Sequence, residues 1–425
     1  MKLVVAGDIH IGRASSAAGQ ALPADRRRTV AAWQAIVELA IAERAAAVCL
    51  TGDVVDESNK YFESAGPLQR GVQRLAEAGV AVFAVTGNHD HDVLPRVADE
   101  LGEDQLCVLG RGGRWQRVRL QRDGAAVHLD GWSYPGPVVD QDPVASYELE
   151  PAPDAPTLVM VHGDLDAPGS RYAPLSRHRL RERPVAGWLL GHIHRPGHDD
   201  EASPFILYPG SPQAMDPGEA GVHGAWVVEV ARGRVAAPRL VPLSSVRYEQ
   251  LELTAEAATT EDELETLLRQ RIRDEGERLA EESGQRLHCL SLRVRLTGRT
   301  AAYEHAETVL ARFAEQWDER VGADVTLYID RVDNQLEPAI DLERCSADDS
   351  PLGAVARLLV ALEQGQGPRE LVQPARQRIR LTRHGSYYSG LPDEPPLDDA
   401  LARAYLRHEA WRLLNDLHAQ AEAGR

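Results

Sequence analysis

Five short runs of apolar, largely β-branched residues each lead into a turn that contains glycine. The runs are Leu3–Val5, Val48–Leu50, Val80–Val85, Leu158–Val161 and Trp188–Leu190. Continuous apolar runs of this length predict strands that are buried on both faces, as in the parallel sheet of an α/β protein. The pattern therefore predicts an α/β domain whose buried strands end in polar turns.

The segments between the first three runs have the helical period instead. Apolar residues recur every three or four positions between Arg28 and Arg44, and again between Leu68 and Ala78. This predicts the order strand, helix, strand, helix, strand for about the first ninety residues. Further strand-like segments follow as far as a closing hairpin around Gly233, so we expect a first domain at 1–245.

The rest of the sequence predicts two smaller parts. A strand, a helix capped by Thr260 and Glu263, and an alternation of strand, helix and strand predict a small α/β capping domain at 246–335. A C-terminal segment at 336–425 is acidic, is interrupted by proline and glycine, and ends in a predicted helix at about 397–421. The aromatic and leucine stripe of that helix favours packing on its own domain over binding to another protein.

The turns that follow the five apolar runs carry carboxylate, amide and imidazole side chains. They are Gly7-Asp8-Ile9-His10, Gly52-Asp53-Val54-Val55-Asp56, Gly87-Asn88-His89-Asp90, His162-Gly163-Asp164 and Gly191-His192-Ile193-His194. Strand ends that feed glycine-containing turns are where an α/β sheet builds its binding site. A single histidine of this kind is typical of a hydrogen-bonded core residue, but their joint occurrence at strand ends predicts one site.

These side chains are suitable ligands for a pair of divalent cations. Two such ions about 3.5–4 Å apart stabilise the attacking and leaving oxygens of an in-line displacement and lower the pKa of a bound water. Asp53 is the best candidate for a bridging carboxylate because it follows the central strand, and Gly7 lets Asp8 and His10 turn toward one ion. The mixture of oxygen and nitrogen donors favours Mn²⁺ or Fe²⁺ over Mg²⁺, whose sites favour oxygen donors.

Composition limits the class of protein. With 425 residues, 43% of them hydrophobic and 26% charged, the chain is expected to be globular. No segment resembles a membrane span or a signal peptide, so a cytoplasmic location is expected. The four cysteines are widely separated and have no zinc-binding spacing, which predicts reduced thiols.

The net charge bears on the substrate. A protein that binds DNA without a partner usually has a basic surface, whereas this chain has a formal net charge of -18. Either the substrate is small, or a partner neutralises most of the phosphates, or the basic residues gather on one face. Arginines do cluster between Arg111 and Arg122 and between Arg171 and Arg183, although a salt-bridged surface is the favoured interpretation of both clusters.

The order of the five turns resembles that of the calcineurin-like metallophosphoesterases. Details resemble their DNA-repair exonuclease branch, the bacterial SbcD and YhaO-type nucleases, over essentially all of 1–245 and more weakly beyond. These details are Tyr172–Ser176, Gly191–Pro196, Tyr208–Pro212 and Gly221–Val230. The resemblance implies a four-layer sandwich of two β-sheets flanked by helices, followed by a capping domain and a C-terminal helical segment.

The same resemblance implies a role for each candidate residue. One metal ion would be held by Asp8, His10 and His194, a second by Asn88, His162 and His192, with Asp53 bridging the two. His89 would face the scissile phosphate, where it would stabilise charge or protonate the leaving oxygen. Asp56 would fix the tautomer of His89 and support its cationic form.

The resemblance also implies a reaction and partners. The family reaction is manganese-dependent cleavage of DNA, here by the nuclease subunit of a double-strand-break repair complex that works with an SbcC-like coiled-coil ABC ATPase and is compatible with a homodimer. The terminal helix is the candidate dock for that ATPase. Two alternatives stay open: a stand-alone enzyme for nucleotides or other small phosphoesters, which the acidic charge favours, and a non-catalytic scaffold, against which the complete ligand set argues.

Overall fold

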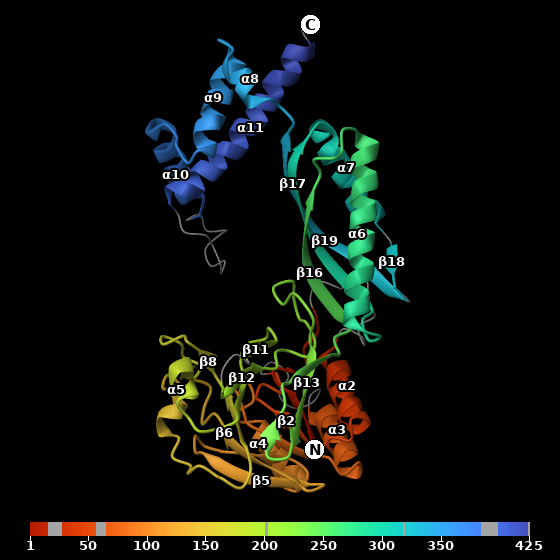
Figure 1. Ribbon diagram of the computed structural model, residues 1–425, viewed down its shortest axis with the longest axis vertical. Helices are drawn as coiled ribbons and strands as arrows, with labels where there is room; N and C mark the ends of the chain where they lie inside the picture. Colours follow the sequence, from red (N-terminus) through yellow and green to blue (C-terminus); the bar gives the residue numbers. More distant parts are fainter. Residues whose placement is uncertain are drawn as a thin grey trace. The chain divides into compact units, whose positions relative to one another are not determined.

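The computed structural model describes residues 1–15, 28–56, 65–199, 203–317, 319–322, 324–383 and 398–423 (Figure 1). The chain divides into two compact units. The first comprises Met1–Leu251, Ile272–Arg293 and Trp317–Arg331, and the second comprises Glu252–Arg271, Val294–Gln316 and Val332–Arg425. The division of the chain at residues 245 and 335 stays a prediction.

The first unit contains a seven-stranded sheet with a parallel centre. Strands β1 (Lys2–Ala6), β2 (Ala47–Leu50), β3 (Ala81–Ala84) and β4 (Cys107–Val108) run parallel to one another. On the other side of β1 lies the antiparallel β13 (Gly224–Ala231), which pairs with β14 (Arg234–Val235) and β15 (Arg239–Pro242). The predicted closing hairpin is thus present, but its second arm is divided into two short strands.

A six-stranded sheet lies in the same unit, in the order β11-β12-β10-β7-β6-β5. Its inner strands β6 (Ala125–Trp132), β7 (Thr157–His162), β10 (Gly187–Gly191) and β12 (Phe205–Tyr208) are parallel. The antiparallel strands β5 (Gln116–Arg122) and β11 (Gly197–Asp199) form its edges. A separate two-stranded sheet joins β8 (Asp164–Leu165) to β9 (Pro174–Leu175).

The alternation of side chains along the strands explains the layers. Leu3 and Val5 on one face of β1 join a core with Leu158 and Met160 of the second sheet. Val4 on the opposite face joins a core that includes residues of three helices, α2 (Thr29–Ala42), α3 (Ala65–Glu77) and α4 (Leu94–Leu101).

The outer face of the second sheet is also covered. Trp188 and Val161 pack there with Leu180 of the short helix α5 (Arg177–Arg181) and with Val144 of the 3₁₀ turn η2 (Pro143–Ser146). The fold is therefore the expected sandwich of two sheets between outer layers. The helices that pack on the second sheet are much shorter than those that pack on the first.

A third sheet has the order β16-β17-β19-β18. The chain builds it as β16 (Val246–Thr254), α6 (Glu261–Ser283), β17 (Cys289–Thr300), α7 (Tyr303–Gln316), β18 (Glu319–Val321) and β19 (Val325–Pro338). This is the predicted alternation of strands and helices.

The end of the chain contains more helix than its sequence suggested. The helices are α8 (Leu342–Ser346), α9 (Pro351–Glu363), α10 (Arg369–Arg383) and α11 (Asp399–Ala423). Only the last was predicted, and its expected first residue, Leu397, lies outside the described residues. Trp411 and Leu414 of α11 are buried in a core that includes Leu359 of α9, whereas Tyr405 and Leu413 are exposed.

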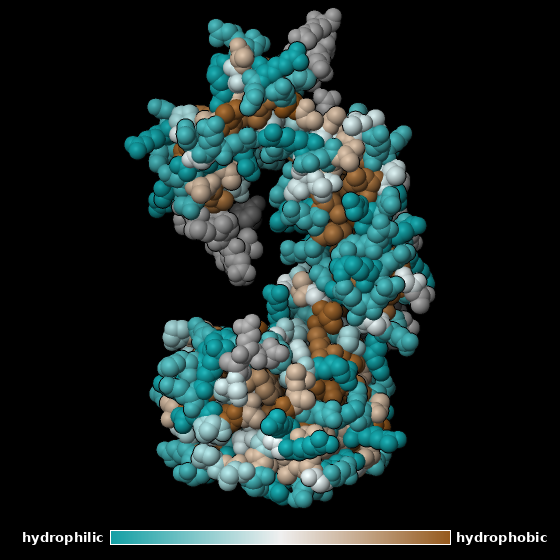
Figure 2. All heavy atoms as spheres, viewed as in Figure 1, coloured by the Kyte–Doolittle hydropathy of each residue, from teal (hydrophilic) through white to brown (hydrophobic). Residues whose placement is uncertain are grey.

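The exterior in view is largely hydrophilic (Figure 2). Over the described residues, none of the helices has the length and apolar character needed to cross a membrane.

Candidate metal centre

The candidate ligands lie at the carboxyl ends of five parallel strands drawn from both large sheets. Asp8 and His10 follow β1, Asp53 follows β2, and Asn88 follows β3 in the first sheet. In the second sheet His162 ends β7, and the segment after β10 carries the last two histidines, His192 and His194. Segments that are far apart in sequence thus meet where the two sheets end.

The backbone at these positions is unusual. Asp8, His10, Asp53 and His192 have φ values of 50°, 47°, 49° and 98°, in the region that residues other than glycine rarely adopt. Each such residue costs on the order of 1–3 kcal/mol, which the surrounding structure must offset. Strain that gathers on four candidate ligands supports a functional constraint on this edge.

Glycines ahead of the ligands allow close approach of the loops. A Cβ atom on Gly87 would lie 2.2 Å from Oδ1 of Asp53, and one on Gly52 would lie 2.6 Å from Nδ1 of His162. Gly52 also has φ 98°, so a side chain there would meet both a clash and strain. The glycines that mark the sequence motifs are therefore required by packing.

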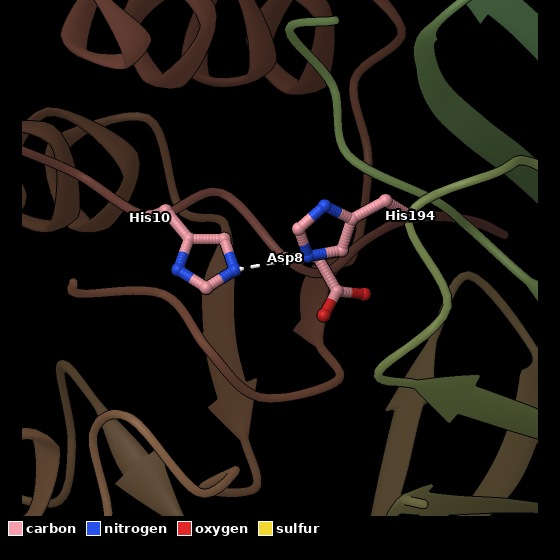
Figure 3. A group of neighbouring side chains, drawn as sticks. All are labelled: Asp8, His10 and His194. Carbon is pink, nitrogen blue, oxygen red and sulfur yellow. Dashed lines mark hydrogen bonds between the residues drawn. The ribbon is translucent and has the colours of Figure 1, made fainter. Parts of the chain in front are cut away.

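Asp8, His10 and His194 form the first group of converging donors (Figure 3). Their donor atoms all lie within 4.8 Å of one another, and the Nε2 atoms of His10 and His194 are 3.2 Å apart. Nδ1 of His194 lies 2.6 Å from Oε1 of Glu219, so this nitrogen carries the proton and Nε2 presents a lone pair. The donor set therefore fits a cation between the two rings.

A second group converges around His162, which is fully buried. Its Nδ1 lies 3.0 Å from the carbonyl oxygen of Thr51, and its Nε2 lies 3.3 Å from Oδ1 of Asn88 and 3.4 Å from Oδ2 of Asp53. With Nδ1 donating to Thr51, an imidazole lone pair, an amide oxygen and a carboxylate oxygen face one another. That arrangement needs a proton or a cation among them.

Asp53 belongs to two of the three groups of candidate donors, one with Asp8 and His162 and the other with His10 and His89. This position agrees with a carboxylate that bridges two ions. His192 is in none of the three groups. Its backbone N–H donates to the Asp8 carboxylate at 3.0 Å, and its ring packs 5.1 Å from that of Tyr172.

His89 and Asp56 lie beside the first group. Nδ1 of His89 is 3.9 Å from Oδ1 of Asp56, and the His89 ring meets the His10 ring edge-on with 4.9 Å between centroids. The side chain of His89 is 31% exposed, far more than that of Asp56 or His10. An accessible histidine next to a buried carboxylate suits a group that meets substrate. Because His89 also belongs to a donor group, its role as a non-ligand stays a prediction.

Burial and mutual charge set the protonation of the cluster. Burial alone would raise the pKa of Asp53, but the neighbouring imidazoles, His162 foremost, together outweigh it and hold the pKa of Asp53 well below its usual range. Burial opposes the cationic form of His162, yet Asp53 raises the pKa of His162 to about 9. Burial and the charge of His162 lower the pKa of His192 to about 4. Without metal, a proton on His162 thus balances Asp53.

Two carboxylates at this site were not assigned a role from sequence. Asp90, fully buried, accepts hydrogen bonds from the backbone N–H of Val54 at 2.7 Å and of Gly87 at 2.8 Å, so it ties together the loops after β2 and β3. Burial and the charge of Asp53 raise the pKa of Asp90 to about 7. Glu219 contacts His194 from a loop 25 residues later. Asp90 ends a recognised motif, whereas no local pattern marks Glu219.

The chain resembles known proteins mainly in its first half. A curated relative, the uncharacterized metallophosphoesterase YhaO of Bacillus subtilis, is 26% identical over 214 residues, which are 50% of this chain and 52% of the relative. The chain thus spans about half the length of the curated relative it matches.

Solved structures provide more distant matches. A dimetal phosphatase from Danio rerio is 13% identical with a TM-score of 0.38, and the alignment covers 57% of this chain and 98% of that one. The protein TT1561 of Thermus thermophilus is 12% identical with a TM-score of 0.35, over 56% of this chain and 98% of that one. Likenesses of this degree carry no argument about substrate.

The family model described as calcineurin-like phosphoesterase matches residues 1–196, the stretch that contains all nine candidate site residues. Residues 1–196 are therefore similar to the calcineurin-like phosphoesterases, and the three groups of donors described above lie within that stretch.

Proposed function

We propose that this chain is a two-metal-dependent phosphodiesterase that cleaves DNA, as the nuclease subunit of a double-strand-break repair complex acting with an SbcC-like ABC ATPase. The observation that carries the chemistry is the convergence of carboxylate, imidazole and amide donors from five strand ends. When bound there, two divalent ions, with Mn²⁺ the proposed metal, neutralise phosphate charge and activate water.

The proposed ligands are the seven residues Asp8, His10, Asp53, Asn88, His162, His192 and His194. Asp8, His10 and His194 would hold one ion, Asn88, His162 and His192 the other, and Asp53 would contact both. Thr51 and Glu219 lie against Nδ1 of His162 and His194, so Nε2 of each ring would be the nitrogen available to an ion.

His89 is the proposed catalytic residue that is not a ligand. With Nδ1 toward Asp56, its Nε2 is the nitrogen left to stabilise the phosphate or to give a proton to the leaving oxygen. The Asp56 carboxylate favours the cationic form that both tasks require.

Residues beside the cluster support a nucleic-acid substrate. Tyr172 is 39% exposed, and its ring packs against His192, so a base can stack on it next to the proposed metal position. The side chain of Arg13 is 40% exposed, and its Nε lies 3.9 Å from Asp56, close enough to the cluster to contact a substrate phosphate.

The ATPase would supply most of the remaining phosphate neutralisation, because the chain has a net charge of -18. Its proposed dock is the exposed apolar part of α11, with Tyr405 54% and Leu413 49% exposed. The test is incubation of the chain with linear and nicked DNA plus Mn²⁺, with and without an SbcC-like coiled-coil ATPase. Mn²⁺-dependent degradation that is stimulated by the ATPase and absent from Asp53→Asn is the expected result.

The acidic charge favours a second function, hydrolysis of nucleotides or other small phosphoesters. Both functions use the same cluster, so the assays must compare substrates on one preparation. Rapid turnover of bis(p-nitrophenyl) phosphate with intact DNA, whether or not the ATPase is present, would favour the second function and contradict the first.

A further inference from the structure

Glu219 makes a short contact with a candidate ligand. Its Oε1 lies 2.6 Å from Nδ1 of His194, and the opposite nitrogen of that ring faces His10. The imidazole is thus held between a carboxylate and the proposed metal position. A carboxylate in this place fixes the ring orientation and makes the ligating nitrogen more basic.

The carboxylate is itself held in place. Oε2 of Glu219 lies 2.9 Å from the hydroxyl of Ser211 and accepts the backbone N–H of Met215 at 2.8 Å. The backbone N–H of Ser211 in turn donates to the carbonyl of His194 at 2.8 Å. The Glu219 side chain is only 12% exposed, so water screens its charge weakly. Glu219 and His194 are therefore fixed by one network.

His162, in the other group of candidate ligands, has a different hydrogen-bond partner from His194. Nδ1 of His162 faces the carbonyl oxygen of Thr51 at 3.0 Å, which is a neutral acceptor. A carbonyl fixes the tautomer as well as a carboxylate does, but it brings no negative charge to the ligand. The two candidate metal positions therefore differ in the charge behind their histidines.

We propose that Glu219 is a positioning residue that makes the position formed by Asp8, His10 and His194 the tighter of the two metal positions, so that it fills first. The inference rests on the proposed two-metal function. Partners of metal ligands typically change metal affinity by about 10- to 100-fold, and Glu219 is expected to act within that range.

Metal affinity tests this role without an activity assay. The metal-free full chain is titrated with Mn²⁺, and binding is followed by calorimetry and by the electron paramagnetic resonance signal of free Mn²⁺. The wild type is expected to show two classes of site. Glu219→Ala is expected to weaken the tighter class by about 10- to 100-fold and to leave the weaker class unchanged. Glu219→Gln keeps an acceptor for His194 without the charge, so its loss is expected to be smaller.

Two further variants separate Glu219 from general effects of charge or folding. Asp154→Asn removes a carboxylate whose Oδ1 lies 3.0 Å from Nε2 of His128, outside the cluster, and should leave Mn²⁺ binding as in the wild type. In a His194→Ala background, which should lack the tighter class, Glu219→Ala should have no added effect. Circular dichroism of each metal-free variant checks that it folds.

The outcomes of the titration are distinguishable. If the wild type bound no Mn²⁺, the proposed metal site itself would be wrong. If the wild type bound two ions while folded Glu219→Ala matched it, or lost affinity only in the weaker class, the proposed role of Glu219 would be overturned and the two-metal function would stand.

Discussion

Asp130 and Asp53, two buried carboxylates of the first unit, differ in what balances their charge. Asp130 receives two hydrogen bonds of 2.7 Å from the Arg117 guanidinium and one of 2.5 Å from the Tyr147 hydroxyl. Asp53 accepts the backbone N–H of His89 at 2.9 Å, and its other neighbours include the imidazoles of His162 and His10. A permanent cation makes the first carboxylate self-sufficient, whereas the second requires a proton or a metal ion. Asp130 is therefore a buried charge with a structural partner, whereas Asp53 is a candidate for a functional one.

The largest effect is expected from Asp53→Asn, which removes the shared charge. The side-chain amide of asparagine has one oxygen, whereas two ions need a carboxylate to bridge them. We therefore expect phosphodiester turnover to fall to background and one of the two ions to be lost. Metal analysis and phosphodiester turnover on the same preparation measure both. A variant that kept two ions and wild-type turnover would show that Asp53 does not bridge.

Breaking the ion pair between Arg117 and Asp130 should affect the stability of the fold and not the candidate metal site. Among the described side chains, Arg117→Ala leaves Tyr147 as the hydrogen-bond partner of the buried Asp130, so a loss of about 3–5 kcal/mol in the free energy of unfolding is expected. Metal affinity of the folded protein should not change. Denaturant unfolding and Mn²⁺ titration check the two parts.

Arg119 is the matched control on the same strand. It pairs with Asp154, and both side chains are about half exposed, at 45% and 54%. Arg119→Ala should therefore cost only about 0–1 kcal/mol. Equal losses in the two arginine variants would contradict the distinction between a buried and an exposed pair.

Removing His89 should separate chemistry from metal binding. Of the proposed catalytic pair His89 and Asp56, His89 has the more exposed side chain, and its proposed role is to stabilise the transition state. We expect His89→Ala to keep both ions and to lower kcat by about 10²-fold or more, the usual scale for one such group. Loss of metal as complete as in Asp53→Asn would make His89 a ligand instead.

Removal of metal by a chelator should lower the stability of the folded protein, and the size of this effect should depend on Asp53. Mn²⁺ present at a hundred times its Kd should stabilise the folded state by about 2.7 kcal/mol. Adding a chelator should therefore lower the free energy of unfolding of the wild type by about that amount. Arg117→Ala should respond like the wild type because its cluster is intact. Asp53→Asn should respond much less, and an equal response would mean that metals bind elsewhere.

The sequence was sufficient to predict features that depend on short runs of neighbouring residues. Apolar runs with glycine at their ends located β1, β2, β3, β7 and β10, and therefore the candidate ligands that follow them. The contact of Glu219 with His194 spans 25 residues and that of Asp90 with Val54 spans 36, so both exist only once the loops have folded. No periodic pattern could have revealed them.

The helices before the last one illustrate a different limit. Proline was expected to interrupt the C-terminal segment, yet Pro351 opens α9, with Ser350 as the capping residue, and Pro374 lies within α10. The stripe on α11 also divides in a way that the sequence does not specify. Trp411 and Leu414 are buried in the core shared with α9, while Tyr405 and Leu413 are left exposed.

The most direct test is a crystal grown with Mn²⁺ and measured at the manganese absorption edge. We expect two anomalous peaks about 3.5–4 Å apart, one beside Asp8, His10 and His194 and the other beside Asn88, His162 and His192, with Asp53 touching both. A single peak, peaks outside this strand-end cluster, or side chains turned away from the ions would contradict it.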